Sequence, residues 1–174
     1  MTAGPQPAEE EGILVDEEDR PVGTAPRSEI RGRNLLHRGT AILCRDPAGR
    51  IFLHRRTDTK DVFPGLYDVF AGGMVSPGES YEESARRELS EELGIEGAEL
   101  RLLFKHRYLG PENRLWTTVY EVIWDGPVRL QPEEIVSGEF VEEAELVERL
   151  DELPFVPDGL EVFRRYLAER AKAD

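Results

Sequence analysis

A predicted helix that concentrates three glutamates on one side constrains this chain more than any other feature. Between Ser80 and Gly94 apolar residues recur every four positions, which predicts one amphipathic helix with a single buried stripe. Glu88, Glu91 and Glu92 stand at i, i+3 and i+4, so their side chains are neighbours along the edge of that stripe. Carboxylates this close repel one another, and a bound hard cation that prefers oxygen ligands is the usual relief. We therefore expect the functional part of the molecule in this segment.

Residues at both ends of the helix and just upstream support this interpretation. Ser80 is followed three residues later by a glutamate, which completes a capping box, and Gly94 is suited to the position that ends a helix. A solvated acidic face is the ordinary reading of a glutamate-rich helix. The upstream Gly72 and Gly73 argue against it, because glycines let backbone carbonyls approach a ligand closely. Glu79 adds a further carboxylate directly before the cap.

The overall composition restricts the functional classes. A net charge of -14 over 174 residues argues against a nucleic-acid partner, because basic patches supply that affinity. The single cysteine, Cys44, rules out an internal disulfide framework and fits a reducing cytoplasm. The acidic, proline-rich N-terminus has no apolar run of the kind that a signal peptide needs, and no window reaches the length of a membrane span. We expect a cytoplasmic protein without a membrane partner.

The pattern of apolar runs predicts one mixed α/β domain over residues 12–174, preceded by a polar tail over residues 1–11 that we expect to be disordered. An N-terminal β-hairpin is predicted from Ile13 through Val22, and one short helical turn follows it. Further strands are predicted in the segments GTAILC, IFLHRR, YDVFAGGMV, 100–109, 115–124 and 135–141, and helices around 144–150 and 159–172. The stretch DTKDVFPGLYD between two of these strands is predicted to be a loop.

The segment from Gly73 to Ile95 resembles a known family motif. Gly73, five residues, Glu79, seven residues and then RELSEELGI match the complete Nudix box, G-x5-E-x7-R-E-U-x-E-E-x-G-U, where U is a bulky aliphatic residue. Every defined position is filled. The resemblance implies an α/β/α sandwich with a mixed sheet, in which the box forms a loop, a helix and a second loop.

The N-terminal half narrows the resemblance. LVDEEDRPVGTA and the segment around FPGLYD are similar to the isopentenyl-diphosphate-isomerase-like branch of Nudix proteins, especially its bacterial YfcD-type group. The isomerases depend on a cysteine in the strand after this segment, where the present chain has YDVFAGGMV. Cys44 belongs to an earlier strand and is expected to be a core residue. Hydrolysis is therefore favoured over isomerisation. A non-catalytic nucleotide-sensing domain is the other alternative, although it would not need the intact box.

The resemblance also implies roles for the residues of the box. Glu88, Glu91 and Glu92, together with the Gly73 carbonyl, would hold Mg²⁺, for which Mn²⁺ can substitute. Glu88 is also the candidate general base. Arg87, with Glu79, would orient the metal-binding carboxylates. Independently of the resemblance, Arg87 lies four residues before Glu91, a spacing at which it can brace that carboxylate. The substrate would be a small-molecule diphosphate, either a nucleoside diphosphate derivative or a related organic pyrophosphate.

The family often adds a further acidic residue from a later loop, which serves as a metal ligand or as a base. In QPEEIVSGEF we expect this residue to be Glu134, with Glu133 and Glu139 as alternatives. Basic residues near the site are candidates to bind phosphate, because a guanidinium pairs with phosphate oxygens through two hydrogen bonds. Arg55 and its neighbour end one predicted strand, so only one of the two can face the site, and we expect it to be Arg55. Lys60 in the following loop is a second candidate.

Aromatic and histidine residues give weaker indications. Phe63, Tyr67 and Trp116 could stack on a base, although core packing is the more frequent role of such residues. His37 and His54 are poor candidates for a metal pair, because the nearby carboxylates suit a hard cation better. The N-terminal hairpin could extend the sheet or provide the surface of a homodimer.

Overall fold

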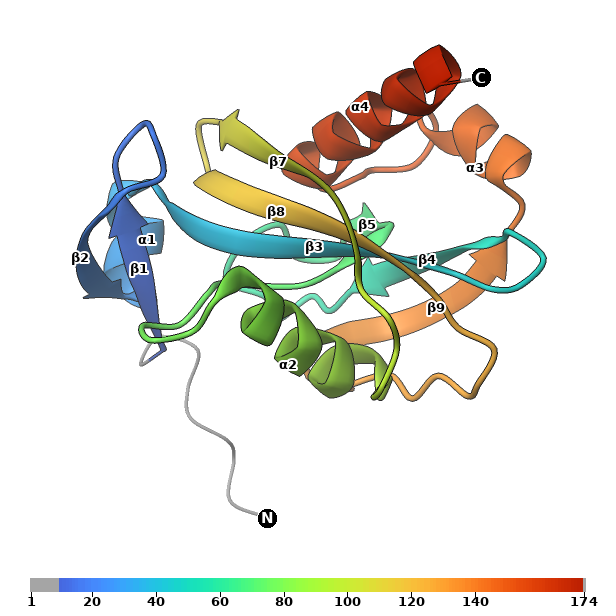
Figure 1. Ribbon diagram of the computed structural model, residues 1–174, viewed down its shortest axis with the longest axis horizontal. Helices are drawn as coiled ribbons and strands as arrows, with labels where there is room; N and C mark the ends of the chain where they lie inside the picture. Colours follow the sequence, from blue (N-terminus) through green and yellow to red (C-terminus); the bar gives the residue numbers. More distant parts are fainter. Residues whose placement is uncertain (1–9, 174) are drawn as a thin grey trace.

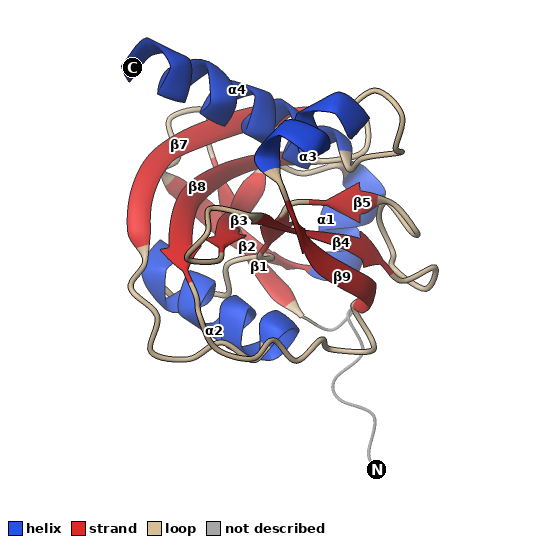
Figure 2. Cartoon of the chain, turned by 90° about the vertical axis from the view of Figure 1, so that its right-hand side faces the viewer, coloured by secondary structure: helices blue, strands red, loops and turns tan. Residues whose placement is uncertain are grey.

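A mixed β-sheet lies between two layers of helices (Figures 1 and 2). The computed structural model of the protein describes residues 10–173. The strands are β1 (Glu11–Val15), β2 (Pro21–Pro26), β3 (His37–Arg45), β4 (Ile51–Arg56), β5 (Tyr67–Asp68), β6 (Phe70–Ala71), β7 (Arg101–Leu109), β8 (Arg114–Ile123) and β9 (Ile135–Val141). The helices are α1 (Arg27–Arg33), α2 (Tyr81–Leu93), α3 (Glu143–Arg149) and α4 (Pro157–Ala173). The predicted α/β/α sandwich with a mixed sheet is confirmed.

Strand β3 organises the sheet. It runs parallel to β8 along its whole length and antiparallel to β1, β4 and β6. Strand β4 pairs in turn with β5 and β9, and β7 pairs with the other edge of β8. Both faces of β3 are covered, because Ala41 and Leu43 enter one core while Ile42 and Cys44 enter the other. This explains why the strand reads as a nearly continuous apolar run.

Each core joins the sheet to one helical layer. On one face, α3 and α4 contribute Leu146 and Phe163, both fully buried. On the other face, α2 contributes Ala85, Leu89 and Leu93, which form the predicted apolar stripe. Ser80 caps α2 by accepting the backbone N–H of Glu83, and Gly94 ends the helix in the left-handed conformation, as predicted. The acidic edge of α2 is thereby held against the sheet.

The N-terminal hairpin extends the sheet, which was one of its two predicted roles. Leu14 of β1 pairs with His37 of β3. The hairpin turn is tied down at Asp19, whose carboxylate accepts hydrogen bonds from Arg38, Lys105 and Tyr81. Helix α1 follows the hairpin and is longer than the single turn predicted for it. Residues 1–9 of the predicted tail lie outside the described residues, and residue 11 already belongs to β1.

The predicted strand YDVFAGGMV is divided into two short strands. Tyr67 pairs with Arg55 of β4, whereas Phe70 pairs with Leu43 of β3, so the chain crosses from one strand to another. The carboxylate of Asp68 accepts the backbone N–H of Phe70 at this crossing. The chain is therefore delivered to the centre of the sheet just before the glycine pair of the box.

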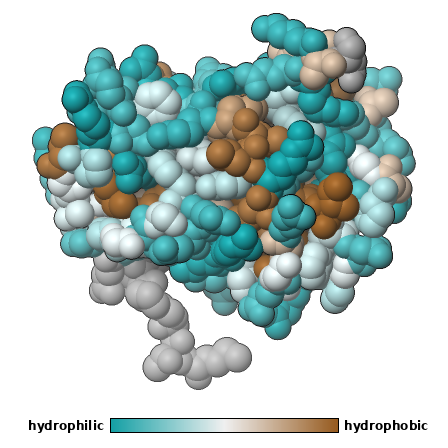
Figure 3. All heavy atoms as spheres, viewed as in Figure 1, coloured by the Kyte–Doolittle hydropathy of each residue, from teal (hydrophilic) through white to brown (hydrophobic). Residues whose placement is uncertain are grey.

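The surface agrees with the acidic composition. The face shown in Figure 3 is mainly hydrophilic, and hydrophobic side chains form several separate patches on it. The exposed large hydrophobic residues include Leu102 and Leu109 of β7 and Ile123 of β8. None of the helices within residues 10–173 combines the length and the apolar character that crossing a membrane would require.

Candidate active site

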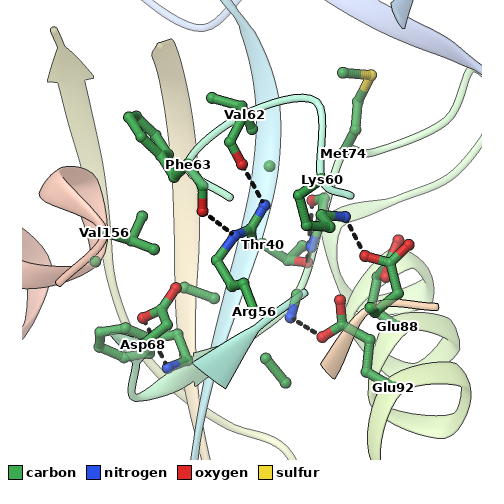
Figure 4. A pocket seen from close by; sticks show the side chains of 18 of the residues that line it. Thr40, Arg56, Lys60, Val62, Phe63, Asp68, Met74, Glu88, Glu92 and Val156 are labelled. Atoms are coloured by element: carbon green, nitrogen blue, oxygen red, sulfur yellow. Dashed lines mark hydrogen bonds and ion pairs between the residues drawn. The ribbon is translucent and has the colours of Figure 1, made fainter. Parts of the chain in front are cut away.

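A cavity of about 1010 Å³ opens beside the acidic edge of α2. Its walls come from α1, β3, β4, the loop between β4 and β5, the box, and the start of α4. Glu88, Glu91, Glu92 and Gly73 all line it, as do Arg87 and Lys60. Figure 4 shows Glu88 and Glu92 projecting from α2 toward Lys60. The fold therefore brings together almost all of the predicted site residues.

Arg87 links the loop before α2 to the carboxylates of the helix. Its Nε and Nη2 donate to both oxygens of Glu79, at 2.7 and 3.0 Å. Its Nη1 donates to Glu88 at 3.0 Å and to Glu91 at 3.3 Å. Glu79 in turn accepts the backbone N–H of Ser76 at 2.9 Å. One guanidinium thus positions three carboxylates, which is the bracing role predicted for Arg87 from its spacing.

Two of the carboxylates are buried, and this changes their acidity. Glu88 and Glu92 are each only 8% exposed. Burial raises the pKa of Glu88 to about 7, with Arg87 opposing the shift and Glu91 adding to it. Burial also raises the pKa of Glu92 above its ordinary value, and the charge of Glu88 adds to the effect. Burial thus disfavours the ionised form of both carboxylates, and a nearby positive charge would stabilise that form.

The glycine pair allows the strand to approach these carboxylates. A Cβ on Gly73 would lie 2.6 Å from Oε1 of Glu88, so any side chain there would displace that carboxylate. Gly72 has φ +143°, and a Cβ on it would lie 2.1 Å from the backbone oxygen of Thr40. The N–H of Gly72 donates to Glu92 at 2.9 Å, while the Gly73 carbonyl accepts the N–H of Thr40 at 2.9 Å. The two glycines thus connect the sheet directly to the acidic helix.

Lys60 and Glu134 meet in the lining of the cavity. The ammonium of Lys60 donates to the carboxylate of Glu134. The loop that carries Lys60 is anchored by Asp61, which accepts two hydrogen bonds from Arg27 of α1 at 2.7 and 3.0 Å. Glu133 also lines the cavity and is exposed.

Of the three candidate acidic residues, Glu139 is the one that the fold excludes. It is exposed on β9, opposite Leu53, and does not line the cavity.

The orientation predicted for Arg55 is wrong. Arg55 turns away from the cavity, and its guanidinium donates to the Gly65 carbonyl and to the exposed Asp58. Arg56 lines the cavity instead, and it donates to the carbonyls of Phe63 and Val62 at 3.2 and 3.0 Å (Figure 4). Successive residues of a strand point to opposite faces, so the alternation itself was predictable. Which face meets the cavity depends on the pairing of β4 with distant strands, and the residue pattern of β4 alone does not reveal it.

Of the three aromatic candidates, only Phe63 lines the cavity. Tyr67 packs against Phe155, and Trp116 donates its indole N–H to the backbone of the N-terminal hairpin turn. His37 and His54 both line the cavity but are deeply buried. Burial lowers the pKa of His37 to about 4 and that of His54 to about 3, so both imidazoles are neutral near pH 7.

Sequence reasoning missed a group of polar residues that line the cavity. It comprises Arg31 of α1, Asn113 of the β7–β8 turn, Asp68 of β5 and Asp158 of α4. These residues belong to four distant segments and form no motif. The one available signal was an aspartate directly after a proline at the start of a predicted helix, which is a capping pattern and not a binding pattern.

The residues of the box suit a hard divalent cation. Glu88, Glu91, Glu92 and the Gly73 carbonyl offer only oxygen donors, and two of these carboxylates are buried beside one another. Within residues 10–173 no three His, Cys, Asp or Glu side chains are arranged to enclose an ion. The fit therefore rests on the chemistry of the donors and on the buried like charges.

Cys44 has no part in the cavity. Its side chain packs in the core beneath α2 and is 1% exposed, as predicted for a core residue. Burial raises the pKa of its thiol to about 12, so the reactive thiolate is disfavoured.

Comparisons with known proteins extend the similarity well beyond the box. The chain matches the NUDIX domain family over residues 35–166. It is 48% identical over 153 residues to a Nudix hydrolase of Pseudomonas aeruginosa, a match that covers 88% of this chain and 90% of the relative. It is 36% identical over 159 residues to the Nudix hydrolase YfcD of Escherichia coli, covering 91% and 87% of the two chains. The crystal structure of DR0079 from Deinococcus radiodurans matches with a TM-score of 0.77 at 30% identity, covering 90% of this chain and 98% of that chain.

Proposed function

The chain belongs to the Nudix hydrolase family, in its YfcD-type group, and we propose that it is a Mg²⁺-dependent enzyme that cleaves a diphosphate linkage. The substrate is a nucleoside diphosphate derivative or a related organic pyrophosphate. A cytoplasmic location, expected from the sequence, and a homodimer, one of the two roles considered for the N-terminal hairpin, are part of this proposal.

One observation carries the proposal. The buried carboxylates of Glu88 and Glu92 face the same cavity as Lys60 and Arg56. A diphosphate is a poor electrophile because its negative charge repels nucleophiles. A site for this substrate must therefore combine cationic side chains that bind phosphate with carboxylates that bind a metal. This cavity is lined by both kinds of group.

Glu88, Glu91, Glu92 and the Gly73 carbonyl would hold the metal. Mg²⁺, or Mn²⁺ in its place, offsets the charge of the phosphoryl oxygens and makes water a better nucleophile. Arg87 and Glu79 keep the carboxylates of the helix oriented. Residues that hydrogen-bond to metal ligands are commonly as important for metal affinity and activity as the ligands themselves.

Glu88 is the proposed general base. A general base must be positioned to accept a proton from the attacking water, and the carboxylate of Glu88 lines the cavity, where Arg87 holds it in place. Lys60 and Arg56 would bind the phosphoryl oxygens and hold the substrate across the cavity. Glu134, which pairs with Lys60, would set the position of that ammonium group.

The test is the release of phosphate or nucleotide from a panel of pyrophosphates in the presence of Mg²⁺. We expect Glu91→Gln and Glu92→Gln to reduce turnover by about 100-fold or more, the size typical of a lost electrostatic contact in a transition state. Glu82→Gln is the matched control, since Glu82 is exposed on the same helix and its ion pair is with the neighbouring Arg86. The proposal fails if no compound is cleaved, or if all three variants behave like the wild type.

The isomerase alternative has little support from the site. An isomerase of this branch needs a reactive cysteine in the cavity, and Cys44 is buried elsewhere with a raised pKa. Conversion of isopentenyl diphosphate into dimethylallyl diphosphate by the purified protein would reverse this preference.

A further inference from the structure

Beyond the residues of the box, the cavity is lined by polar side chains that the proposed chemistry does not use. Arg31 and Asn113 meet there, and Nη1 of Arg31 donates to Oδ1 of Asn113 at 2.8 Å. Asp158 lies in the first turn of α4 and also lines the cavity. All three residues lie outside the box. They come from α1, the β7–β8 turn and α4, and the proposed metal-binding residues come from the box.

Two atoms in this group are buried without a hydrogen-bond partner among the described residues. They are Oδ1 of Asp158 and Nε of Arg31. The carboxylate nearest to Arg31 Nε belongs to Asp61, at 3.8 Å, which is beyond hydrogen-bond distance. One of the two atoms is an acceptor and the other a donor. Together they could pair with a ligand that presents both a donor and an acceptor.

A second carboxyl group adds to the polarity of the cavity lining. Asp68 faces the cavity near Phe63 and Val156 (Figure 4), and its carboxylate lies so close to Gly159 that a Cβ there would be 2.5 Å from Oδ1. Burial raises the pKa of Asp68 to about 7, and the charge of Asp158 adds to this shift. Burial also raises the pKa of Asp158 above its ordinary value. Carboxyl groups that are held in this way can donate as well as accept hydrogen bonds.

We propose that the group formed by Arg31, Asn113 and Asp158 is a specificity subsite that binds a hydroxyl- or amide-bearing substituent of the diphosphate substrate. This inference rests on the proposed function and deepens it. Asp158 and Arg31 are its specificity-determining residues. Phe63 and Val156 provide an apolar wall beside them.

The energetics disfavour a hydrocarbon substituent. A buried polar atom that is left without a partner is destabilising, because it has lost its hydrogen bonds to water and gained none in return. A prenyl chain beside these residues would expel water and leave both unpaired atoms unsatisfied. A sugar or a nucleoside would pair with them. A site built to hydrogen-bond its substrate rejects an apolar analogue much more strongly than an apolar pocket rejects a polar one.

The test is binding that does not depend on hydrolysis. Two methylene-bridged diphosphonates, one carrying a ribonucleoside and one carrying a geranyl group, are titrated into the protein with Mg²⁺ by calorimetry. We expect the wild type to prefer the nucleoside ligand by about tenfold or more, equivalent to at least one satisfied buried pair. Asp158→Leu should remove most of this preference. Asp158→Asn, which retains the shape and a hydrogen-bonding group, should retain part of it.

Two controls separate specificity from folding and from catalysis. Asp151→Asn changes an aspartate that is 91% exposed and should leave the preference unchanged. Thermal unfolding of each variant identifies any that fail to fold. Equal binding of the two ligands by the wild type, no binding of either, or an unchanged preference in Asp158→Leu would overturn the subsite. Because these ligands are not hydrolysed, lack of turnover on true substrates would count against the proposed function alone.

Discussion

The substitution Gly73→Ala tests whether activity requires the carboxylate of Glu88 to lie directly against the backbone of Gly73. The backbone of Gly73 lies outside the left-handed region, so alanine adds no backbone strain there. Its new Cβ would lie 2.6 Å from Oε1 of Glu88, whereas ordinary contacts begin near 3.4 Å. The carboxylate must therefore retreat by roughly 0.8 Å, and a misplacement of about 1 Å in an active site can cost on the order of 100-fold in rate.

The effect on stability should be much smaller than the effect on activity. The atom in contact is the end of a flexible side chain, so Glu88 can rotate away. We expect the free energy of unfolding to fall by about 1 kcal/mol, the lower end for an overpacked site. In a chain of this size this corresponds to about 2–4 °C in the melting temperature. Steady-state hydrolysis and thermal unfolding, measured on the same preparation, give both quantities.

Two other glycines serve as references for this prediction. Gly72→Ala places a Cβ 2.1 Å from the Thr40 backbone oxygen at φ +143°, so it should destabilise the whole fold by roughly 3 kcal/mol or more. Gly23→Ala on β2 meets no atom within 4 Å and should change neither activity nor stability. Full activity in Gly73→Ala, with an unchanged melting temperature, would refute the claim that Glu88 must occupy its observed position.

Three further predictions follow from the contacts of the site. Arg87→Met should lower the free energy of unfolding by about 2 kcal/mol and activity by tenfold or more, because Glu79 and Glu88 lose charged hydrogen bonds. Arg86→Met should change activity little. Chemical denaturation measures the stability of each variant, and steady-state kinetics measures its activity. Arg56→Met should raise KM by about tenfold and Arg55→Met by less than about twofold, since of these two arginines Arg56 is the one that lines the cavity. Equal effects on KM in the two variants would contradict the proposed role of Arg56 in phosphate binding. The pKa of Asp68 is raised from 3.8 to about 7 in the folded state, so the native state binds more protons than the unfolded state between these pH values. The stability of the wild type should therefore fall relative to that of Asp68→Asn as the pH rises from about 4 to 7. Urea denaturation at a series of pH values measures this difference, and a constant difference would disprove the prediction.

The helix that carries the box was predictable because its signals are local. Capping by Ser80, termination at Gly94 and the four-residue spacing of Ala85, Leu89 and Leu93 depend only on neighbours in the sequence. The strands β7, β8 and β9 were predictable within about a residue for the same reason. The bracing of Glu91 by Arg87 followed from their four-residue spacing.

Where the predictions failed, long-range pairing decided the outcome. The register of β4 against β5 and β9 determines that Arg56 and not Arg55 meets the cavity. The segment after Tyr67 became two short strands because it crosses from β4 to β3. Glu139 was excluded by its place on β9, although it lies only a few residues from Glu134 in the sequence.

The sequence by itself determined that a helix with three carboxylates, preceded by two glycines, would form and would suit a metal. Only the tertiary structure decided what faces that helix across the cavity. Arg31, Asn113 and Asp158 come together because α1, the β7–β8 turn and α4 all pack around the same end of the sheet. Spacing along the chain is a reliable guide within one helix, but the contacts between distant segments depend on how the sheet is assembled.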